Sequence, residues 1–283
     1  MKKIWIIARM TFLETIRRRI VLTGLVLGLV FLTAFTIGFR FIYINLNNST
    51  TGVSEAFTNV VNNEGLNVLT LAGLYAVTFL SAAMGALLGA DTLSGEIVSG
   101  TIQTIVTKPI PRSYVVLGKW LGFAILLAFY SMLMSGGTVL STWIQSGIAP
   151  RNVLPGISLI YLESLLIMTI SLSCSSFLSG LATGGVVFGL YGLSFIGGWV
   201  EQIGSLLQNE TAVKVGIVTS LLIPSEALWR RAAFEMQSPI SAALGMSPFG
   251  TTSVPSPLMI GYAVIYLMLT LMAAVSIFKH RDL

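Results

Sequence analysis

The residues best suited to chemistry gather between residues 91 and 116, in a chain that carries little charge elsewhere. Only 10% of the 283 residues are charged, yet this stretch holds the acids Asp91 and Glu96 and the bases Lys108 and Arg112. Long apolar runs end just before it and begin just after it, which is typical of a water-facing connection between two membrane spans. Such charges suit the docking of a soluble partner, and the two acids also suit the plainer task of capping helix starts.

Helix-breaking residues divide this stretch into short pieces. Gly100 and Pro109 frame the segment Thr101–Lys108, which has room for one or two helical turns. We predict that residues 91–116 form a cytosolic hinge with this short helix inside it. The residues expected to couple the hinge to a partner are Asp91, Glu96, Gly100, Thr101, Lys108, Pro109 and Arg112.

The sequence offers no catalytic machinery of its own. The Gly-x-x-x-x-Gly-Lys-Ser/Thr loop that cradles nucleotide phosphates is absent, because the only Gly-Lys pair is followed by Trp120. With His280 as the single histidine and Cys174 as the single cysteine, neither a histidine-based triad nor a Cys/His metal site can be built. We therefore expect no enzyme activity, no metal and no cofactor on this chain.

Glu163 is the one carboxylate that falls inside a predicted span, about two turns from its outer end. Acids within a membrane are costly and often functional, so Glu163 is a candidate residue of a translocation path. The alternative is that it pairs with Arg40 or Arg151 near the outer interface and only fixes helix packing.

Composition requires a membrane protein built from helices. The chain is 54% hydrophobic with a mean hydropathy of +0.87, and its continuous apolar runs are long enough to cross a bilayer as helices. The net charge of +5 comes from basic residues beside these runs, which indicates lipid headgroups and topology signals rather than nucleic acid. We predict an all-α fold with spans at about 20–42, 66–90, 117–144, 157–177, 181–200 and 258–278.

Charge placement sets the orientation. Six spans put both termini in the cytosol, with 11 of the 16 Lys and Arg residues inside. Residues 1–19 are predicted to form an amphipathic helix on the inner surface, or alternatively a simple topology-setting leader. Residues 201–257 are predicted to lie outside, and their apolar run 212–224 is short enough to indicate an interfacial or re-entrant helix. If that run crossed the membrane, the last span would be inverted.

Glycine pairs four residues apart recur in the predicted spans and favour a closely packed bundle. For each pair, packing within the chain is the simpler interpretation and a dimer seam is the alternative. The pairs are Gly24 with Gly28, Gly85 with Gly89, Gly118 with Gly122, and Gly185 with Gly189.

The hinge pattern resembles the membrane subunit of type 2 ABC exporters, the ABC-2 permeases, and is closest to the branch that serves multicopper-enzyme maturation. The resemblance covers residues 1–120 well, and the rest matches in helix count and small-residue style. The matching residues are Asp91, Ser94-Gly95-Glu96, Ser99-Gly100-Thr101, Lys108-Pro109-Ile110, Arg112, Gly118-Lys119, and the run from Ala8-Arg9 through Glu14 to Arg17–Arg19.

The resemblance implies a type V exporter-like permease fold in the cell membrane, a homodimer or paired permease, and separate cytosolic ABC ATPase subunits that hold ATP and Mg²⁺. It also implies that the short hinge helix seats in a groove of the ATPase and that residues 201–257 hold short re-entrant helices. Two other functions stay open from the residues: a secondary transporter driven by an ion gradient, and a membrane anchor that recruits an ATPase for work on an extracytosolic partner. The sequence names no substrate.

Overall fold

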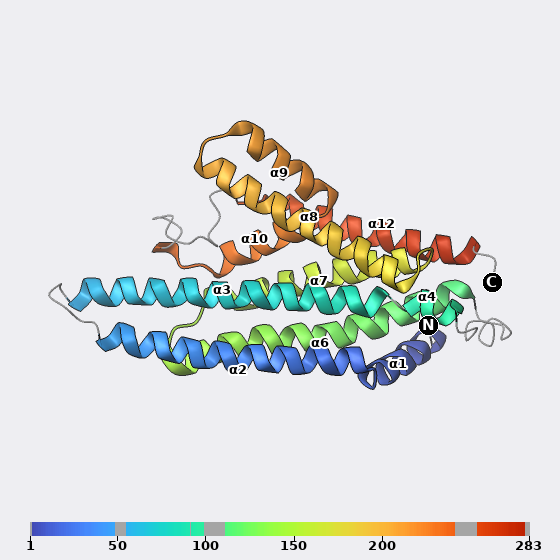
Figure 1. Ribbon diagram of the computed structural model, residues 1–283, viewed down its shortest axis with the longest axis horizontal. Coiled ribbons are helices and arrows are strands. Elements are labelled where there is room, and N and C mark those ends of the chain that lie inside the picture. The colour runs from blue at the N-terminus through green and yellow to red at the C-terminus, as the bar shows by residue number, and fades with distance from the viewer. Residues whose placement is uncertain (1, 49–54, 91, 99–110, 241–253, 281–283) are drawn as a thin grey trace.

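The computed structural model describes residues 2–48, 55–90, 92–98, 111–240 and 254–280 (Figure 1). Every regular element within these residues is a helix, so the predicted all-α fold is confirmed. The described helices are α1 (Lys2–Ile16), α2 (Arg19–Asn48), α3 (Glu55–Ala90), α4 (Thr92–Val98), α6 (Arg112–Ser146), α7 (Val153–Ser175), α8 (Gly180–Leu206), α9 (Glu210–Leu222), α10 (Ser225–Met236) and α12 (Leu258–His280).

Six of the described helices are long and apolar enough to cross a membrane: α2, α3, α6, α7, α8 and α12. Each predicted span overlaps one of them, but most helices run past the apolar run, since a helix continues into water wherever its residues allow. The 36 residues of α3 measure about 54 Å at 1.5 Å per residue, against about 30 Å of hydrocarbon. The predicted outer loop 43–65 is therefore partly helical.

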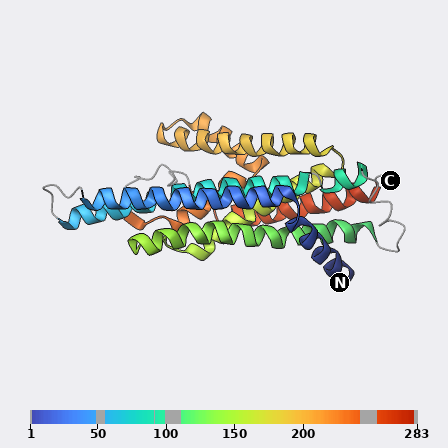
Figure 2. The same cartoon turned by 60° about the horizontal axis from the view of Figure 1, so that its bottom comes forward.

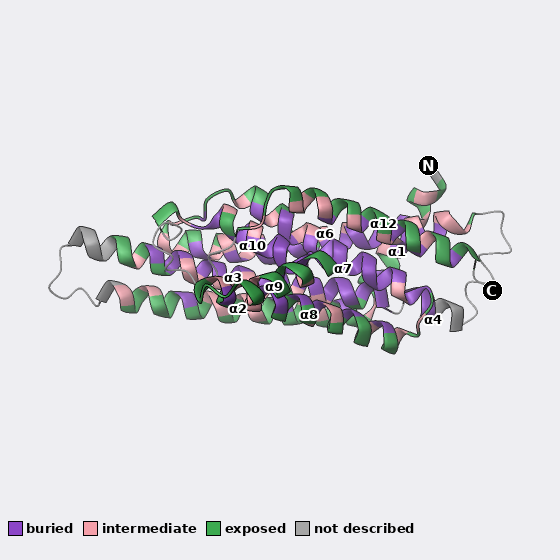
Figure 3. Cartoon of the chain, turned by 90° about the horizontal axis from the view of Figure 1, so that it is seen from above, coloured by how far each residue is buried: buried purple, intermediate pink, exposed green. Residues whose placement is uncertain are grey.

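The spans form an inner and an outer set. Helices α3, α6 and α7 are the inner set, with 56–61% of their most apolar windows buried, whereas the windows of α2, α8 and α12 are only 11–28% buried. Figure 3 shows the buried residues gathered along the middle of the bundle. The exposed apolar side chains of the outer set are what lipid or another protein chain would cover.

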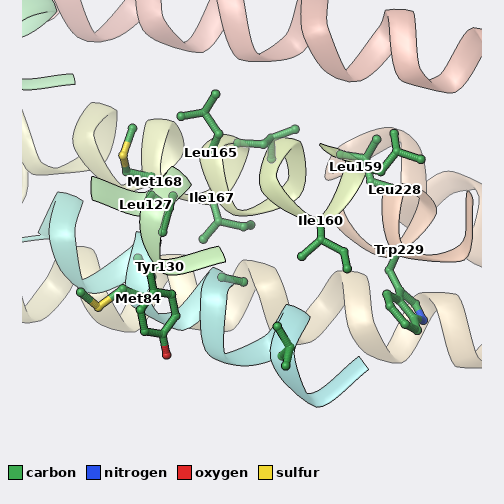
Figure 4. Packing of buried hydrophobic residues seen from close by; sticks show 14 of the residues in the cluster. Met84, Leu127, Tyr130, Leu159, Ile160, Leu165, Ile167, Met168, Leu228 and Trp229 are labelled. Atoms are coloured by element: carbon green, nitrogen blue, oxygen red, sulfur yellow. The ribbon is translucent and has the colours of Figure 1, made fainter. Parts of the chain in front are cut away.

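The core lies around α7. Figure 4 shows its side chains packed between α6, α3 and α10. Two glycines of α3 allow the closest approach, because a Cβ on Gly85 would lie 2.7 Å from the Ser164 carbonyl oxygen and one on Gly89 would lie 2.6 Å from the Ser171 Cβ. The core residues labelled in the figure are Leu159, Ile160, Leu165, Ile167 and Met168 of α7, Met84 of α3, Leu127 and Tyr130 of α6, and Leu228 and Trp229 of α10.

Helices α9 and α10 form a sharply bent pair between the last two spans. The angle between them is 104°, the geometry of a broken span or a re-entrant loop. In Figures 1 and 2 the first helix and the end of α12 lie at the same end of the bundle, which requires an even number of crossings. The pair therefore returns to the side from which it came, and we call it the re-entrant hairpin. Its first helix contains most of the apolar run 212–224.

Helix α7 begins earlier than the sequence indicated. It starts at Val153, so Pro155 lies in its first turn, where proline costs little because the first amides have no helical acceptor. Glu163 is thus ten residues from the start and twelve from the end of a 23-residue helix. The expectation placed it about two turns from the outer end of the span, and in the longer helix it stands close to the middle.

Candidate functional site

Five of the seven predicted coupling residues, Asp91, Gly100, Thr101, Lys108 and Pro109, lie outside the described residues. Of the other two, Glu96 is part of α4 and Arg112 begins α6. The Arg112 Nη1 donates a hydrogen bond of 3.3 Å to the carbonyl oxygen of Lys279, near the end of α12. The start of α6 is thereby attached to the end of the last span.

A single serine at the end of α7 holds the start of α4. The Ser175 hydroxyl oxygen accepts hydrogen bonds from the backbone N–H groups of Leu93 at 3.1 Å and Ser94 at 3.2 Å. These are first-turn amides that lack a partner within their own helix. The Leu93 side chain is fully buried in a cluster with residues of α6, α7 and α12. We call this set of contacts the α4 seat.

Helix α1 lies against α6 at the same end of the bundle. A Cβ on Gly118 would lie 2.7 Å from the Ile7 Cβ, and one on Gly122 would lie 2.7 Å from the Ala8 carbonyl oxygen. This glycine pair therefore serves packing within the chain. The opposite face of α1 is apolar and exposed, as expected of a helix in the membrane interface; its large residues are Trp5, Ile6, Met10 and Leu13.

The tip of the re-entrant hairpin is fixed to α8 by one hydroxyl group. Ser194 donates to the carbonyl oxygen of Ile223 at 2.9 Å, and its oxygen lies 2.8 Å from the Ser225 hydroxyl and 3.3 Å from the backbone nitrogen of Glu226. All of these residues are buried. The chain reversal between α9 and α10 is thus satisfied by hydrogen bonds inside the protein, as a non-helical segment at membrane depth must be.

One turn further along α10, Arg230 forms a buried ion pair with Glu201 of α8. The two contacts measure 2.7 and 2.8 Å and join both carboxylate oxygens to the guanidinium group. The Arg230 Nη2 also donates to the Ser220 hydroxyl of α9 at 3.2 Å. A charge pair of this kind is tolerated in a low-dielectric interior only when its geometry is good, and it ties together α8, α9 and α10.

Glu226 faces the inner helices. Its carboxylate accepts a hydrogen bond of 3.2 Å from the Tyr75 hydroxyl of α3, which in turn accepts one of 3.0 Å from the Trp199 indole of α8. Gly198 makes room for the acid, since any Cβ there would collide with the Glu226 side chain. The hairpin, α8 and α3 therefore meet at one polar point.

Glu163 points toward the same place from α7. Its side chain is fully buried, and neither carboxylate oxygen has a hydrogen-bond partner of ordinary geometry. The groups that act on it electrostatically are the Glu226 carboxylate and the Tyr191 hydroxyl. Arg40 is exposed on α2, and the ion pairs among the described residues include none between it and Glu163.

An apolar groove lies in front of this polar cluster. It has a volume of about 560 Å³ and is formed by α2, α3 and α8, with Tyr75 and Tyr191 on its wall. The remaining wall is aromatic and aliphatic, including Phe31, Phe79 and Phe195. The groove thus offers an apolar surface backed by buried carboxylates.

No three His, Cys, Asp or Glu residues come together as a metal site within the described part of the chain.

The family model described as "ABC-2 family transporter protein" matches residues 5–283. The chain belongs to the ABC-2 transporter family. No curated protein matches it, and the family model does not distinguish the multicopper branch.

Membership of the ABC-2 family makes this chain a membrane subunit of a transporter, of a type that is typically not catalytic. Sequence reasoning missed three features of the ABC-2 chain described above: the Ser175 anchor of the α4 seat, the Ser194 clamp and the Glu201–Arg230 ion pair. Glu226 and Arg230 stand four residues apart directly after Pro224, a spacing that places both on one helix face and marks a helix start. That spacing is the signal that was available.

Proposed function

We propose that this chain is the permease half of an ABC exporter in the cell membrane, with both termini in the cytosol. Two copies, or this chain and a related one, would enclose the path, and separate ATPase subunits would hold ATP and Mg²⁺. The sparsely buried windows of α2 and α8 support this arrangement, because they flank the groove and leave it open along one side. A second copy would cover that side.

The observation that carries the proposal is the α4 seat. The seat joins α4, the helix in the first part of the predicted hinge, to the central span α7 through Ser175, and to α6 and α12 through the Leu93 cluster. A displacement of the hinge by an ATPase would therefore act on three spans at once. Rigid-body gating of this kind needs only a ligand that favours one of two arrangements.

The test uses the chain co-purified with its ABC ATPase subunit and reconstituted in lipid. A spin label at Ile196→Cys, in a Cys174→Ser background, reports the distance between two copies, since Ile196 is 61% exposed on α8. We expect ATP with vanadate to change this distance. The variants Glu96→Ala, Gly100→Pro and Leu93→Ala should abolish the change while ATP hydrolysis stays within about twofold, roughly 0.4 kcal/mol in barrier height. An unaltered distance change in all three would contradict the coupling role.

One observation favours a second candidate, a gradient-driven transporter. Such proteins bind their coupling ion at broken helices near the midplane, with buried acids, and the re-entrant hairpin brings Glu226 close to Glu163. Transport in vesicles that carry an ion gradient but no ATPase would support it. Transport that requires the ATPase and ATP would reject it.

A further inference from the structure

The polar cluster behind the groove contains more acids than bases. Glu163, Glu201, Glu226 and Arg230 are each at most 5% exposed, and they come from α7, α8 and α10. Both oxygens of Glu201 are engaged by the guanidinium group of Arg230. That pair is electrically matched, so the remaining two carboxyl groups have no cation of their own.

Glu226 has partial compensation. It accepts from Tyr75, it feels the Arg230 charge one turn away, and it lies in the first turn of α10, where the helix dipole favours an anion. Glu163 has neither a cation nor a helix start beside it. It is a fully buried acid in the middle of a span, whose interacting groups are the Tyr191 hydroxyl and the like charge of Glu226, and neither of its oxygens has a hydrogen bond of ordinary geometry. An ionised carboxylate in that position would be very costly, whereas a protonated one is neutral and can donate.

The groups around the two acids come from three packed helices. Tyr75 of α3, Tyr191 of α8 and Glu226 of α10 face Glu163. Tyr75, Tyr191, Arg230, Glu201 and Glu163 face Glu226. Each of the two tyrosine hydroxyls can donate a hydrogen bond to an ionised carboxylate and can accept one from a protonated carboxyl group. The surroundings therefore suit a pair of acids that together carry one negative charge.

We propose that Glu163 and Glu226 form a proton-binding site in the middle of the membrane, occupied by one proton at neutral pH. The site is closed on the groove side by Tyr75 and Tyr191, and on the outer side by the hairpin tip that Ser194 holds. The bound proton neutralises Glu163, leaves Glu226 as the anion that accepts from Tyr75, and allows α10 to pack on α7 without two facing anions. This site stands apart from coupling to an ATPase and belongs to the chain alone.

The experiment is infrared spectroscopy of the purified full chain in lipid nanodiscs, read at the carbonyl stretching band of protonated carboxyl groups. We expect such a band at neutral pH, shifted in heavy water. Glu163→Gln should remove most of it, because the acid that has neither a cation nor a helix start beside it is then gone. Glu226→Gln should leave the band present but shifted, because Glu163 still has no cation to balance its charge.

The matched control is Glu210→Gln on α9, an acid that is 85% exposed and paired with Lys214. It should leave the band unchanged. A wild-type chain without the band at neutral pH would overturn the proposal, as would a band of unchanged intensity in Glu163→Gln. Both single substitutions preserve side-chain shape, and equal elution on size exclusion establishes that the variants are folded before the spectra are compared.

Discussion

Two regions of the molecule are held by different kinds of contact. At the end that carries the termini, α1 and α4 are fixed by close glycine packing, one serine hydroxyl and a small apolar cluster. At the re-entrant hairpin, the contacts are a buried ion pair, a serine clamp and two acids. Apolar and hydroxyl contacts lose little when helices shift slightly, whereas a buried charge must be either paired or neutral. The first region is suited to movement and the second to discrete states.

Arg230→Met should have the largest effect, because it strands the Glu201 carboxylate in the interior. Breaking a buried pair from one side costs about 3–5 kcal/mol, measured as a lower thermal midpoint of the detergent-solubilised chain. The double variant Glu201→Leu with Arg230→Met removes both charges and should recover most of that loss. If the double variant were as unstable as the single one, the stranded Glu201 charge would not be the cause of the loss.

Gly122→Leu tests the other region. Its Cβ would lie 2.7 Å from the Ala8 carbonyl oxygen, so α1 must move away at a cost of about 1–3 kcal/mol, typical of overpacking. Gly261→Leu on α12 is the matched control, because nothing lies within 4 Å of a Cβ there. Protease accessibility of α1 should rise only in the first variant. Equal protease accessibility of α1 in both variants would show that the close approach at Gly122 does not hold α1 against α6.

Ser175→Ala should loosen the α4 seat locally. Two buried backbone N–H groups lose their acceptor, worth about 1–2 kcal/mol of local opening. Hydrogen exchange at Leu93 and Ser94 should accelerate by about tenfold, while Ser158→Ala, an exposed serine on α7, should leave exchange at these amides unchanged. Unchanged protection in the Ser175 variant would mean that apolar packing alone holds α4.

Lys214→Ala should have the smallest effect. In its ion pair with Glu210 on α9, the side chains of Lys214 and Glu210 are 75% and 85% exposed. Exposed ion pairs four residues apart contribute at most about 0.5 kcal/mol. The thermal midpoint should therefore stay within error of the wild type. A large loss would show that α9 is covered by another surface and that its charges are not in water.

The features of the fold and the site that could be predicted from the sequence are those set by residues close together in the chain. The spans follow from apolar runs, and the connection 176–179 between α7 and α8 follows from its brevity. Glu163 was recognised as unusual because an acid in a span is rare. Its neighbour Glu226 stands 63 positions later, on a helix whose return path is set by a bend at Pro224, and no local pattern reports such a meeting.

The predicted hinge shows the same difference between local and long-range contacts. Arg112 was expected to be a coupling residue, and it begins α6 with a bond to the end of α12. Ser175 was predicted only as part of the span 157–177, because its hydroxyl acts on amides that lie 81 and 82 positions earlier. Such a role arises only when the helices pack together, so no spacing of residues in the sequence indicates it.

The length of α3 has one more consequence. Its 36 unbroken residues exceed the hydrocarbon by about 24 Å, carry Tyr75 half-way along, and end directly before α4. A stiff rod of this kind transmits an axial load without an intervening joint. A load applied at its far end would therefore reach Tyr75 and the α4 seat together.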